Sequence, residues 1–228
     1  MCFSPEASFA GGIIISSIGV ATVTKVHKPS QIIFASIPLF FGIQQFAEGL
    51  LWLTLPLPES ESVRKFSTYF FLIMAEVIWP SMIPLSVLFM EENIKRKRTL
   101  KIFQALGLSL STYYGFCLVF FNISPQIKGY HIQYNTDFPD SFALPAFIVY
   151  LLVTITPLFI SSVKQTYLLG TLMFMSCLVT AIFFTQYLTS VWCFFAALIS
   201  GVIFWILRDS KIEFNFDKLK LLQNPLKK

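Results

Sequence analysis

Residues 32–53 read IIFASIPLFFGIQQFAEGLLWL, and this stretch decides the fold class. Its only charged residue is Glu48. A helix needs about 20 apolar residues to cross about 30 Å of hydrocarbon. A membrane-spanning strand would alternate polar and apolar residues, whereas this stretch is apolar on nearly every face. The stretch therefore predicts a transmembrane helix.

Similar stretches recur along the whole chain of 228 residues, of which 55% are hydrophobic and only 13% are charged, with a mean hydropathy of +0.70. A soluble domain carries about 25% charged residues. The sequence therefore predicts an all-α polytopic membrane protein, with a seven-helix bundle over residues 1–207 and a short basic tail over residues 208–228. The predicted spans are residues 7–23, 32–53, 67–89, 102–121, 143–160, 167–184 and 190–207.

The Lys and Arg residues predict the orientation of these helices, because positive residues collect on the cytoplasmic side of a membrane. With the N-terminus outside, fourteen of the 17 fall in inner loops or in the tail, and only Arg64, Lys65 and Lys128 fall outside. We therefore expect an external N-terminus and a cytoplasmic C-terminus. The longest loop, residues 122–142, has the composition of a surface connector with turns.

The distribution of the same Lys and Arg residues also indicates which kind of partner the protein binds. They are spread along one membrane face rather than interleaved with aromatic residues in a groove, which argues against nucleic acid. Anionic lipid headgroups attract each such charge by about 1 kcal/mol. The contact is expected at the run Lys95, Arg96, Lys97 and Arg98.

Several kinds of chemistry are excluded by composition. The two histidines, His27 and His131, fall on opposite sides of the membrane, so a bis-His haem or a three-His zinc site is not expected. No span contains a Lys that could form a Schiff base. Cys2 is a weak candidate for a reactive thiol or a metal ligand. The cofactor stays unknown, and the other cysteines are interpreted as small apolar packing residues.

Nine of the twelve acidic residues, Glu91 among them, fall in loops or in the tail, where we expect them to be solvated. Carboxylates inside the spans are the candidates for function, because a charge in hydrocarbon is costly unless it is paired, neutral or facing water. Glu48 shares one helical face with Gln44 and Trp52 at i, i+4 and i+8, and Gln45 flanks it. The next span repeats the pairing of an acid with a tryptophan, since Glu76 and Trp79 are i, i+3 neighbours.

Two prolines extend this second motif. Pro80 and Pro84 free backbone carbonyls that could point into a cavity. We expect the two acids to lie with Gln44, Trp52 and Trp79 in one pocket that opens to the outside, with Glu6 nearer the surface. The alternative is that the two acids form hydrogen bonds to Gln44, Gln45 and the backbone, and so hold the bundle together.

The first span carries Ser8, Gly12, Ser16 and Gly19 at near i+4 steps. Small residues along one face let another helix approach closely. This stripe predicts helix packing rather than chemistry.

The N-terminal MCFSPEASF, the segment GIQQFAEGLLW at residues 42–52 and the region from Trp79 to Pro84 resemble a family of small prokaryotic membrane proteins of unknown function. The resemblance implies location in the prokaryotic inner membrane but no activity. The signature residues that it implies are Cys2, Phe3, Ser4, Gln44, Gln45, Glu48, Gly49, Trp52, Trp79 and Pro80.

Three functions stay open on the sequence alone. The first is a channel or secondary transporter for protons, metal ions or organic cations, in which Glu48 and Glu76 handle the ion. The second is a membrane-embedded enzyme acting on a lipid or on an extracytoplasmic small molecule, with one of these acids as general base. The third is a seven-helix sensor or assembly subunit.

Overall fold

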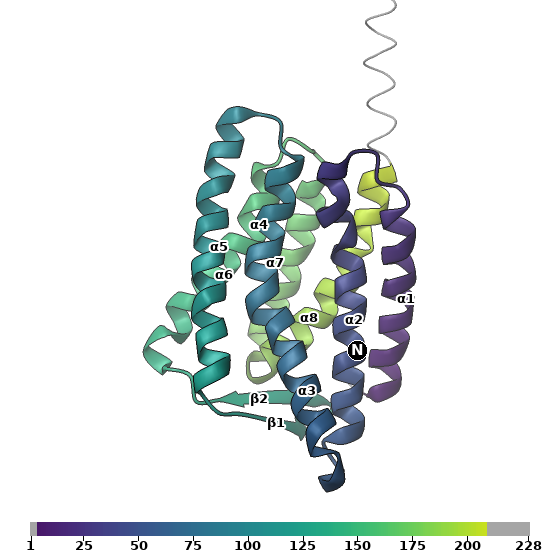
Figure 1. Cartoon of the computed structure of the whole chain (residues 1–228), viewed down its shortest axis with the longest axis vertical. Coiled ribbons are helices and arrows are strands. Elements are labelled where there is room, and N and C mark those ends of the chain that lie inside the picture. The colour runs from purple at the N-terminus through teal and green to yellow at the C-terminus, as the bar shows by residue number, and fades with distance from the viewer. Residues whose placement is uncertain (1–3, 209–228) are drawn as a thin grey trace, which may run out of the picture.

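The computed structural model describes residues 4–208 and is mostly helical, at 81%. Within this range seven helical segments are long and apolar enough to cross a membrane, as the sequence predicts. They run up and down beside one another (Figure 1). Cys2 and tail residues 209–228 lie outside the described residues. The segments are Pro5–Val23, Pro29–Thr54, Pro58–Met90, Ile94–Phe120, Asp140–Ile160, Thr166–Phe183 and Thr185–Arg208.

Most of these segments contain one long α-helix: α1 (Pro5–Val23), α2 (Ile32–Thr54), α5 (Ile94–Phe120), α6 (Asp140–Ile160) and α7 (Thr166–Phe183). The third segment has three parts, namely α3 (Glu61–Leu72), the π-helical η3 (Ile73–Ile78) and α4 (Trp79–Met90). The last begins with η4 (Thr185–Tyr187) and continues as α8 (Leu188–Ser200) and further helical residues to Arg208. Two short 3-10 turns, η1 (Pro29–Gln31) and η2 (Pro58–Ser60), precede α2 and α3.

Two helices begin more than one turn earlier than the apolar pattern predicts, at Glu61 in α3 and at Ile94 in α5. The start of α5 is capped by Asn93, whose side-chain oxygen accepts the backbone N–H groups of Lys95 and Arg96 at 3.0 and 3.3 Å. Such a cap satisfies amides that otherwise lack a partner at a helix start. Apolar patterning marks only the part of a helix that suits hydrocarbon, so it does not reveal these charged helical turns.

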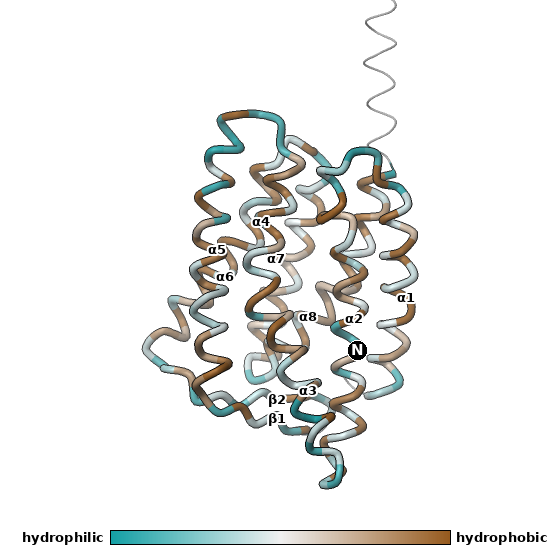
Figure 2. Tube along the Cα trace, viewed as in Figure 1, coloured by the Kyte–Doolittle hydropathy of each residue, from teal (hydrophilic) through white to brown (hydrophobic). Residues whose placement is uncertain are grey.

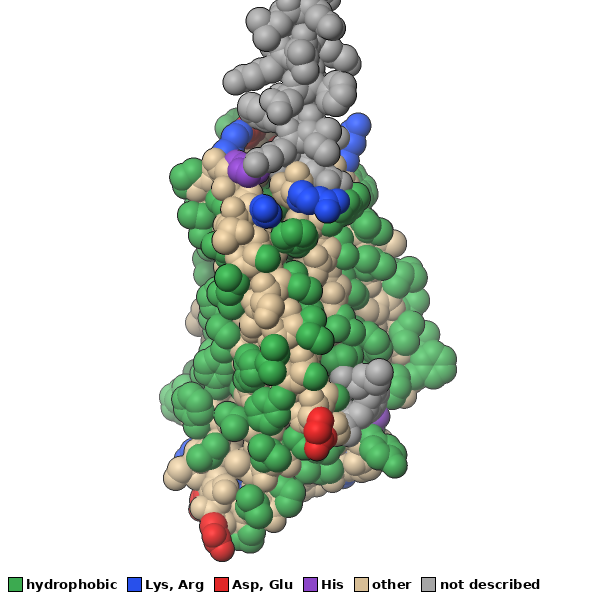
Figure 3. Space-filling view, turned by 90° about the vertical axis from the view of Figure 1, so that its right-hand side faces the viewer, with side chains coloured by type: hydrophobic (Ala, Val, Ile, Leu, Met, Phe, Trp, Pro, Cys, Tyr) green, Lys and Arg blue, Asp and Glu red, His purple; other side chains and the backbone are tan. Residues whose placement is uncertain are grey.

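Charged residues separate to the two ends of the bundle. We call the end with the α1–α2, α4–α5 and α6–α7 turns the basic end, and the other the hairpin end. The helices between are largely hydrophobic (Figure 2), and on the face in Figure 3 most Lys and Arg side chains lie near one end. The basic end carries nine of the twelve Lys and Arg within residues 4–208: Lys25, Lys28, Lys95, Arg96, Lys97, Arg98, Lys101, Lys164 and Arg208.

The predicted connector at residues 122–142 contains a β-hairpin, so the chain is not purely helical. Strands β1 (Ile123–Lys128) and β2 (His131–Thr136) pair antiparallel. Gly129, with a φ of 62°, makes the tight turn that a residue with a Cβ would strain. Ile132 is fully buried beneath the hairpin, and the ring of Tyr134 stacks on that of Phe71 at 5.1 Å. The hairpin thus covers one end of the bundle.

The small-residue stripe of α1 packs against α2, as the sequence predicts. A Cβ on Gly19 would overlap the backbone of Leu39, and a Cβ on Gly42 would overlap Ser16. Close backbone approach therefore fixes α2 against α1. The opposite face of α2, which carries Gln44 and Glu48, is left to face the other helices.

Candidate functional site

A π-helical turn in the middle of the third segment carries Glu76. The N–H of Trp79 donates to the carbonyl of Met74, five residues back, which is the π-helical pattern. Pro80 has no N–H, so the carbonyl of Glu76 loses its usual α-helical donor. Single π-turns inside α-helices are frequent at functional sites. The two prolines flagged in the sequence therefore adjoin an irregular turn rather than a regular helix.

Neighbouring helices supply donors for the carbonyls of this turn. The Tyr150 hydroxyl donates to the carbonyl of Ala75 at 2.6 Å, and the Ser111 hydroxyl donates to that of Val77 at 2.6 Å. At Gly107 a Cβ would overlap the carbonyl oxygen of Pro80, so glycine lets α5 approach α4 closely. Helices α5 and α6 thus hold the turn in place.

The side chain of Glu76 lines a cavity of ≈ 60 Å³ between η3, α5, α6 and α8. This volume is several times the about 10–15 Å³ that one water requires. One carboxylate oxygen of Glu76, Oε2, is buried and has no hydrogen-bond partner among residues 4–208. We call this space the Glu76 cavity. It is lined by Ala75, Glu76, Tyr114, Phe147, Tyr150, Leu188, Thr189, Trp192 and Cys193.

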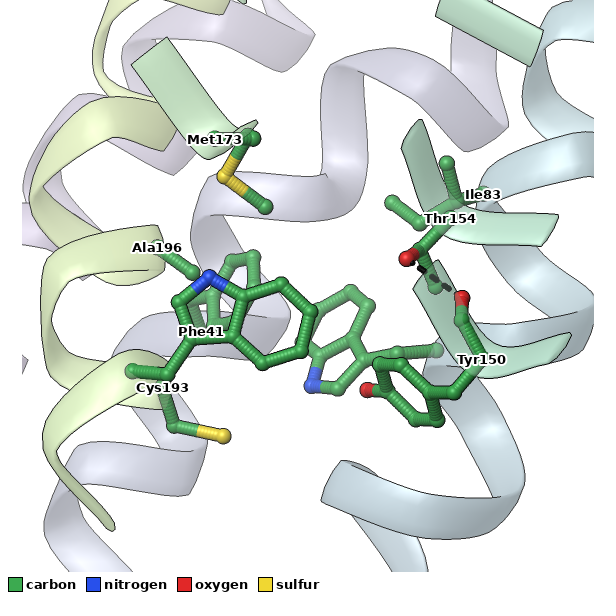
Figure 4. Close-up of a pocket in the computed structure, with 9 residues that line it drawn as sticks. Phe41, Ile83, Tyr150, Thr154, Met173, Cys193 and Ala196 are labelled. Atoms are coloured by element: carbon green, nitrogen blue, oxygen red, sulfur yellow. Dashed lines mark hydrogen bonds between the residues drawn. The ribbon is translucent and has the colours of Figure 1, made fainter. Parts of the chain in front are cut away.

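The Glu76 cavity is the first of a row of three cavities with shared walls. Tyr150, Trp192 and Cys193 also line the second cavity, of ≈ 20 Å³. Figure 4 shows the second cavity, with Phe41, Met173, Cys193 and Ala196 on one side and Ile83, Tyr150 and Thr154 on the other. The third, of ≈ 10 Å³, shares five of these residues, namely Phe41, Ile83, Thr154, Met173 and Ala196.

This row leads through the interior toward the basic end of the bundle. The third cavity also contacts Ser200 and Ile203, late in the last segment, and Leu158, near the end of α6. Among residues 4–208, none of those around the second and third cavities is charged. The row therefore places one carboxylate next to two smaller cavities that share lining residues.

Gln44 links three helices beside the row. Its Oε1 accepts the indole N–H of Trp79 at 2.8 Å. Its Nε2 donates to the sulfur of Cys193 at 3.4 Å and to the carbonyl of Phe71 at 3.5 Å. The ring of Phe41 stacks on Trp79, with centroids 3.8 Å apart. Gln44 thus fixes the indole that lines the second cavity.

Glu48 is fully buried between α2 and α8, and the Ser190 hydroxyl donates to its carboxylate. Gln44 lies one turn from Glu48 on α2, and Cys193 lies one turn from Ser190 on α8. The two contacts make a polar ladder between these helices. Glu48 is thus bonded across the bundle to a residue that the sequence did not pair with it.

The predicted site residues occupy separate places. Glu76 lines the first cavity and Trp79 the second, whereas Glu6 is exposed in the first turn of α1. Gln45 and Trp52 are buried, and neither the amide group of Gln45 nor the indole N–H of Trp52 has a partner in the described part of the chain. The walls of these three cavities do not include the side chains of Gln44, Gln45, Glu48, Trp52 or Glu6.

Sequence reasoning missed the partners of the acids. Tyr150 and Phe147 face the same cavity at i, i+3 spacing on α6, and Ser190 and Cys193 have the same spacing on α8. Polar or aromatic residues at this spacing within an apolar span were the available signal. Spacing alone does not show which helix they face.

A second polar centre at the basic end connects the α4–α5 turn to the α6–α7 turn. Its acid is Glu91, which the sequence predicts to be solvated. That expectation is wrong, because Glu91 is only 2% exposed. Its carboxylate accepts the backbone N–H of Asn93 at 2.8 Å, and the N–H and hydroxyl of Ser162 at 2.8 and 2.7 Å. Burial raises the pKa of Glu91, but these hydrogen bonds outweigh it, and the net pKa lies below its ordinary value.

Arg96 binds the same α6–α7 turn. Its guanidinium donates to the carbonyls of Ile160 and Ser161 at 3.1 and 2.8 Å, where α6 ends and backbone oxygens need donors. We call Glu91, Arg96 and the Ile160–Ser162 turn the basic-end latch. Arg96 belongs to the run that is predicted to bind lipids, and it therefore also contacts another part of the protein.

A family model of unknown function matches most of the chain. No curated protein and no solved structure matches it. The match covers residues 1–215 and so includes all seven apolar segments and every residue of the row of cavities. The chain therefore belongs to the family of unknown function DUF6629.

Proposed function

We propose that this protein is a small channel or secondary transporter for protons or small cations, with Glu76 as the carboxylate that takes up the cation. The observation that carries the proposal is the row of three cavities that starts at Glu76 and continues between the helices. An intramembrane acid facing a cavity is a functional candidate by default.

The contrast between the two intramembrane acids supports this assignment. Glu48 is held by Ser190, as expected for an acid that stabilises the bundle. Glu76 instead has a buried oxygen without a protein partner in the described range, whereas more than about 90% of buried polar groups are bonded. Its cavity has room for water or a cation to satisfy that oxygen.

Orientation is part of the proposal. The nine Lys and Arg residues of the basic end favour a cytoplasmic basic end and an external hairpin end. Half-buried residues of the Glu76 cavity, such as Leu188 and Thr189, lie near the start of the last segment, at the hairpin end. In this orientation a cation enters from outside and the row leads inward.

Anionic lipids are the proposed partner of the basic end. Lys95 and Arg98 are exposed beside the latch, on the first turns of α5. They lie where negatively charged headgroups would attract each residue by about 1 kcal/mol. This contact would hold the latch at the membrane surface.

Charge movement measured on a solid-supported membrane tests the function. Full-length protein in liposomes is exposed to rapid jumps in pH and in the concentration of sodium, potassium or ammonium salts. We expect a current absent from empty liposomes and at least tenfold smaller in Glu76→Gln. The matched control is Glu59→Gln, an exposed acid at the same end, which should leave the current unchanged. An unchanged current in a folded Glu76→Gln variant would overturn the proposal.

A further inference from the structure

The Glu76 cavity combines one carboxylate with four aromatic rings. Tyr114 comes from α5, Phe147 and Tyr150 come from α6, and Trp192 comes from α8. Aromatic faces attract cations, and the attraction grows when the cation is shielded from water. Trp192 is only 6% exposed, so this part of the wall is buried inside the bundle.

The charged side chains around this cavity match a ligand that carries a single positive charge. Within the described part of the chain, its walls hold one acid and neither Lys nor Arg. Calcium takes six to eight oxygen ligands and magnesium a near-octahedral set, and the residues around Glu76 do not offer such a set. Within residues 4–208, no group of three or more His, Cys, Asp or Glu side chains is placed to hold a metal ion.

The unpartnered oxygen of Glu76 further narrows the ligand class. Oε2 is a buried acceptor without a donor from the described chain. An ammonium N–H would supply a charge-assisted hydrogen bond to it, which is stronger than a neutral one. A quaternary ammonium carries no N–H and would leave the oxygen unpaired.

The volume of the cavity limits how large the bound cation can be. A cavity of ≈ 60 Å³ has room for a few non-hydrogen atoms, since one water takes about 10–15 Å³ on this measure. We infer that the Glu76 cavity is a binding site for ammonium and for small primary ammonium ions such as methylammonium, held by the Glu76 carboxylate and the surrounding aromatic side chains. The inference rests on the proposed function, because it names the cation that Glu76 takes up.

Titration of purified full-length protein, followed by tryptophan fluorescence at constant ionic strength, tests the ligand class. Methylammonium should give a saturable change at a concentration at least tenfold lower than sodium or tetramethylammonium. Glu76→Gln should weaken methylammonium binding at least tenfold, and Glu59→Gln should leave it within twofold. Equal binding of sodium or tetramethylammonium, or wild-type binding by Glu76→Gln, would overturn the inference.

A second variant keeps the test decisive if Glu76→Gln does not fold. Phe147→Leu retains the carboxylate and an apolar side chain but removes one ring from the wall. It should weaken methylammonium binding severalfold without changing the response to sodium. Unchanged methylammonium binding would refute the aromatic part of the site. A proton current without methylammonium binding would overturn this inference alone, whereas methylammonium binding without any current would overturn the proposed transport alone.

Discussion

The Tyr150 hydroxyl donates a hydrogen bond to the carbonyl oxygen of Ala75 at 2.6 Å. Ala75 directly precedes Glu76 in the π-helical turn, and Tyr150 also lines the first two cavities of the row. The contact therefore couples α6 both to the backbone that carries the acid and to the wall that separates the cavities.

Loss of this hydrogen bond should be measurable. Tyr150→Phe leaves a buried carbonyl oxygen without a donor, and the expected loss is about 1–3 kcal/mol of stability. Thermal unfolding in detergent should show a lower midpoint. The control is Tyr130→Phe, at a side chain 75% exposed in the hairpin turn, which should leave the midpoint unchanged. Equal midpoints for the two variants would contradict the role given to Tyr150.

Packing of α1 on α2 makes a second prediction. Gly19→Ala forces a methyl group into the backbone of Leu39, so it should destabilise by about 1–3 kcal/mol. Gly115→Ala on α5 is the matched control, because within the described residues no atom outside its own stretch of helix backbone lies within 4 Å of its new Cβ. Alanine is a better helix former by about 0.5–1 kcal/mol, so this control should be neutral or stabilising. Unfolding midpoints that move in the same direction would refute the close-approach account.

The hairpin should contribute to stability through Ile132. This side chain is fully buried in a cluster with Trp52, Phe71 and Leu118. Ile132→Ala should cost about 2–5 kcal/mol, since the space it leaves is enclosed. Deletion of the exposed Tyr130 side chain by alanine should cost far less. If thermal unfolding does not separate the two variants, the hairpin does not pack as described.

The basic-end latch predicts a pH dependence. The pKa of Glu91 is lowered in the folded state, so the stabilisation by its carboxylate is present above the ordinary value of about 4.3 and is lost as the pH falls through the lower folded pKa. The unfolding midpoint of the wild type should exceed that of Glu91→Gln at neutral pH, and the gap should narrow below about pH 4.

Glu92 is the control for that measurement. It forms an exposed ion pair with Lys28 at 2.8 Å, and such pairs contribute about 0–1 kcal/mol. Glu92→Gln should therefore shift the midpoint little at any pH. A gap for Glu91→Gln that stays constant down to strongly acidic pH would show that its charge does not stabilise the latch.

The seven long apolar helical segments could be predicted from sequence because hydrocarbon thickness imposes a length on every apolar helix that could cross it. The same criterion failed where charged side chains continue a helix beyond the apolar part, as at Ile94. It also does not reveal the hairpin, because the two six-residue strands around Gly129 are too short for a criterion based on membrane thickness. Apolar length predicts the segments but neither their ends nor the structure between them.

The candidate site was predictable only in part. Glu48 and Glu76 stand out as acids in apolar spans, but sequence gives no reason to separate them into a bonded acid and a cavity acid. That difference depends on Ser190, which bonds Glu48, and on the cavity walls around Glu76, which come from helices far along the chain. Contacts between distant helices follow from packing, which local spacing does not report. The burial of Glu91 was missed for the same reason, since Ser162 is its partner.

The central claim is that a cation taken up at Glu76 passes along the row of cavities. The most direct test measures the current on a solid-supported membrane for Ala196→Val, which enlarges a side chain shared by the second and third cavities. Ala197→Val is the matched control, because Ala197 is equally buried but lies outside the walls of these three cavities. With both variants folded, as judged by thermal unfolding, the account predicts a current at least tenfold lower in Ala196→Val and near wild type in Ala197→Val. A wild-type current in Ala196→Val would contradict it.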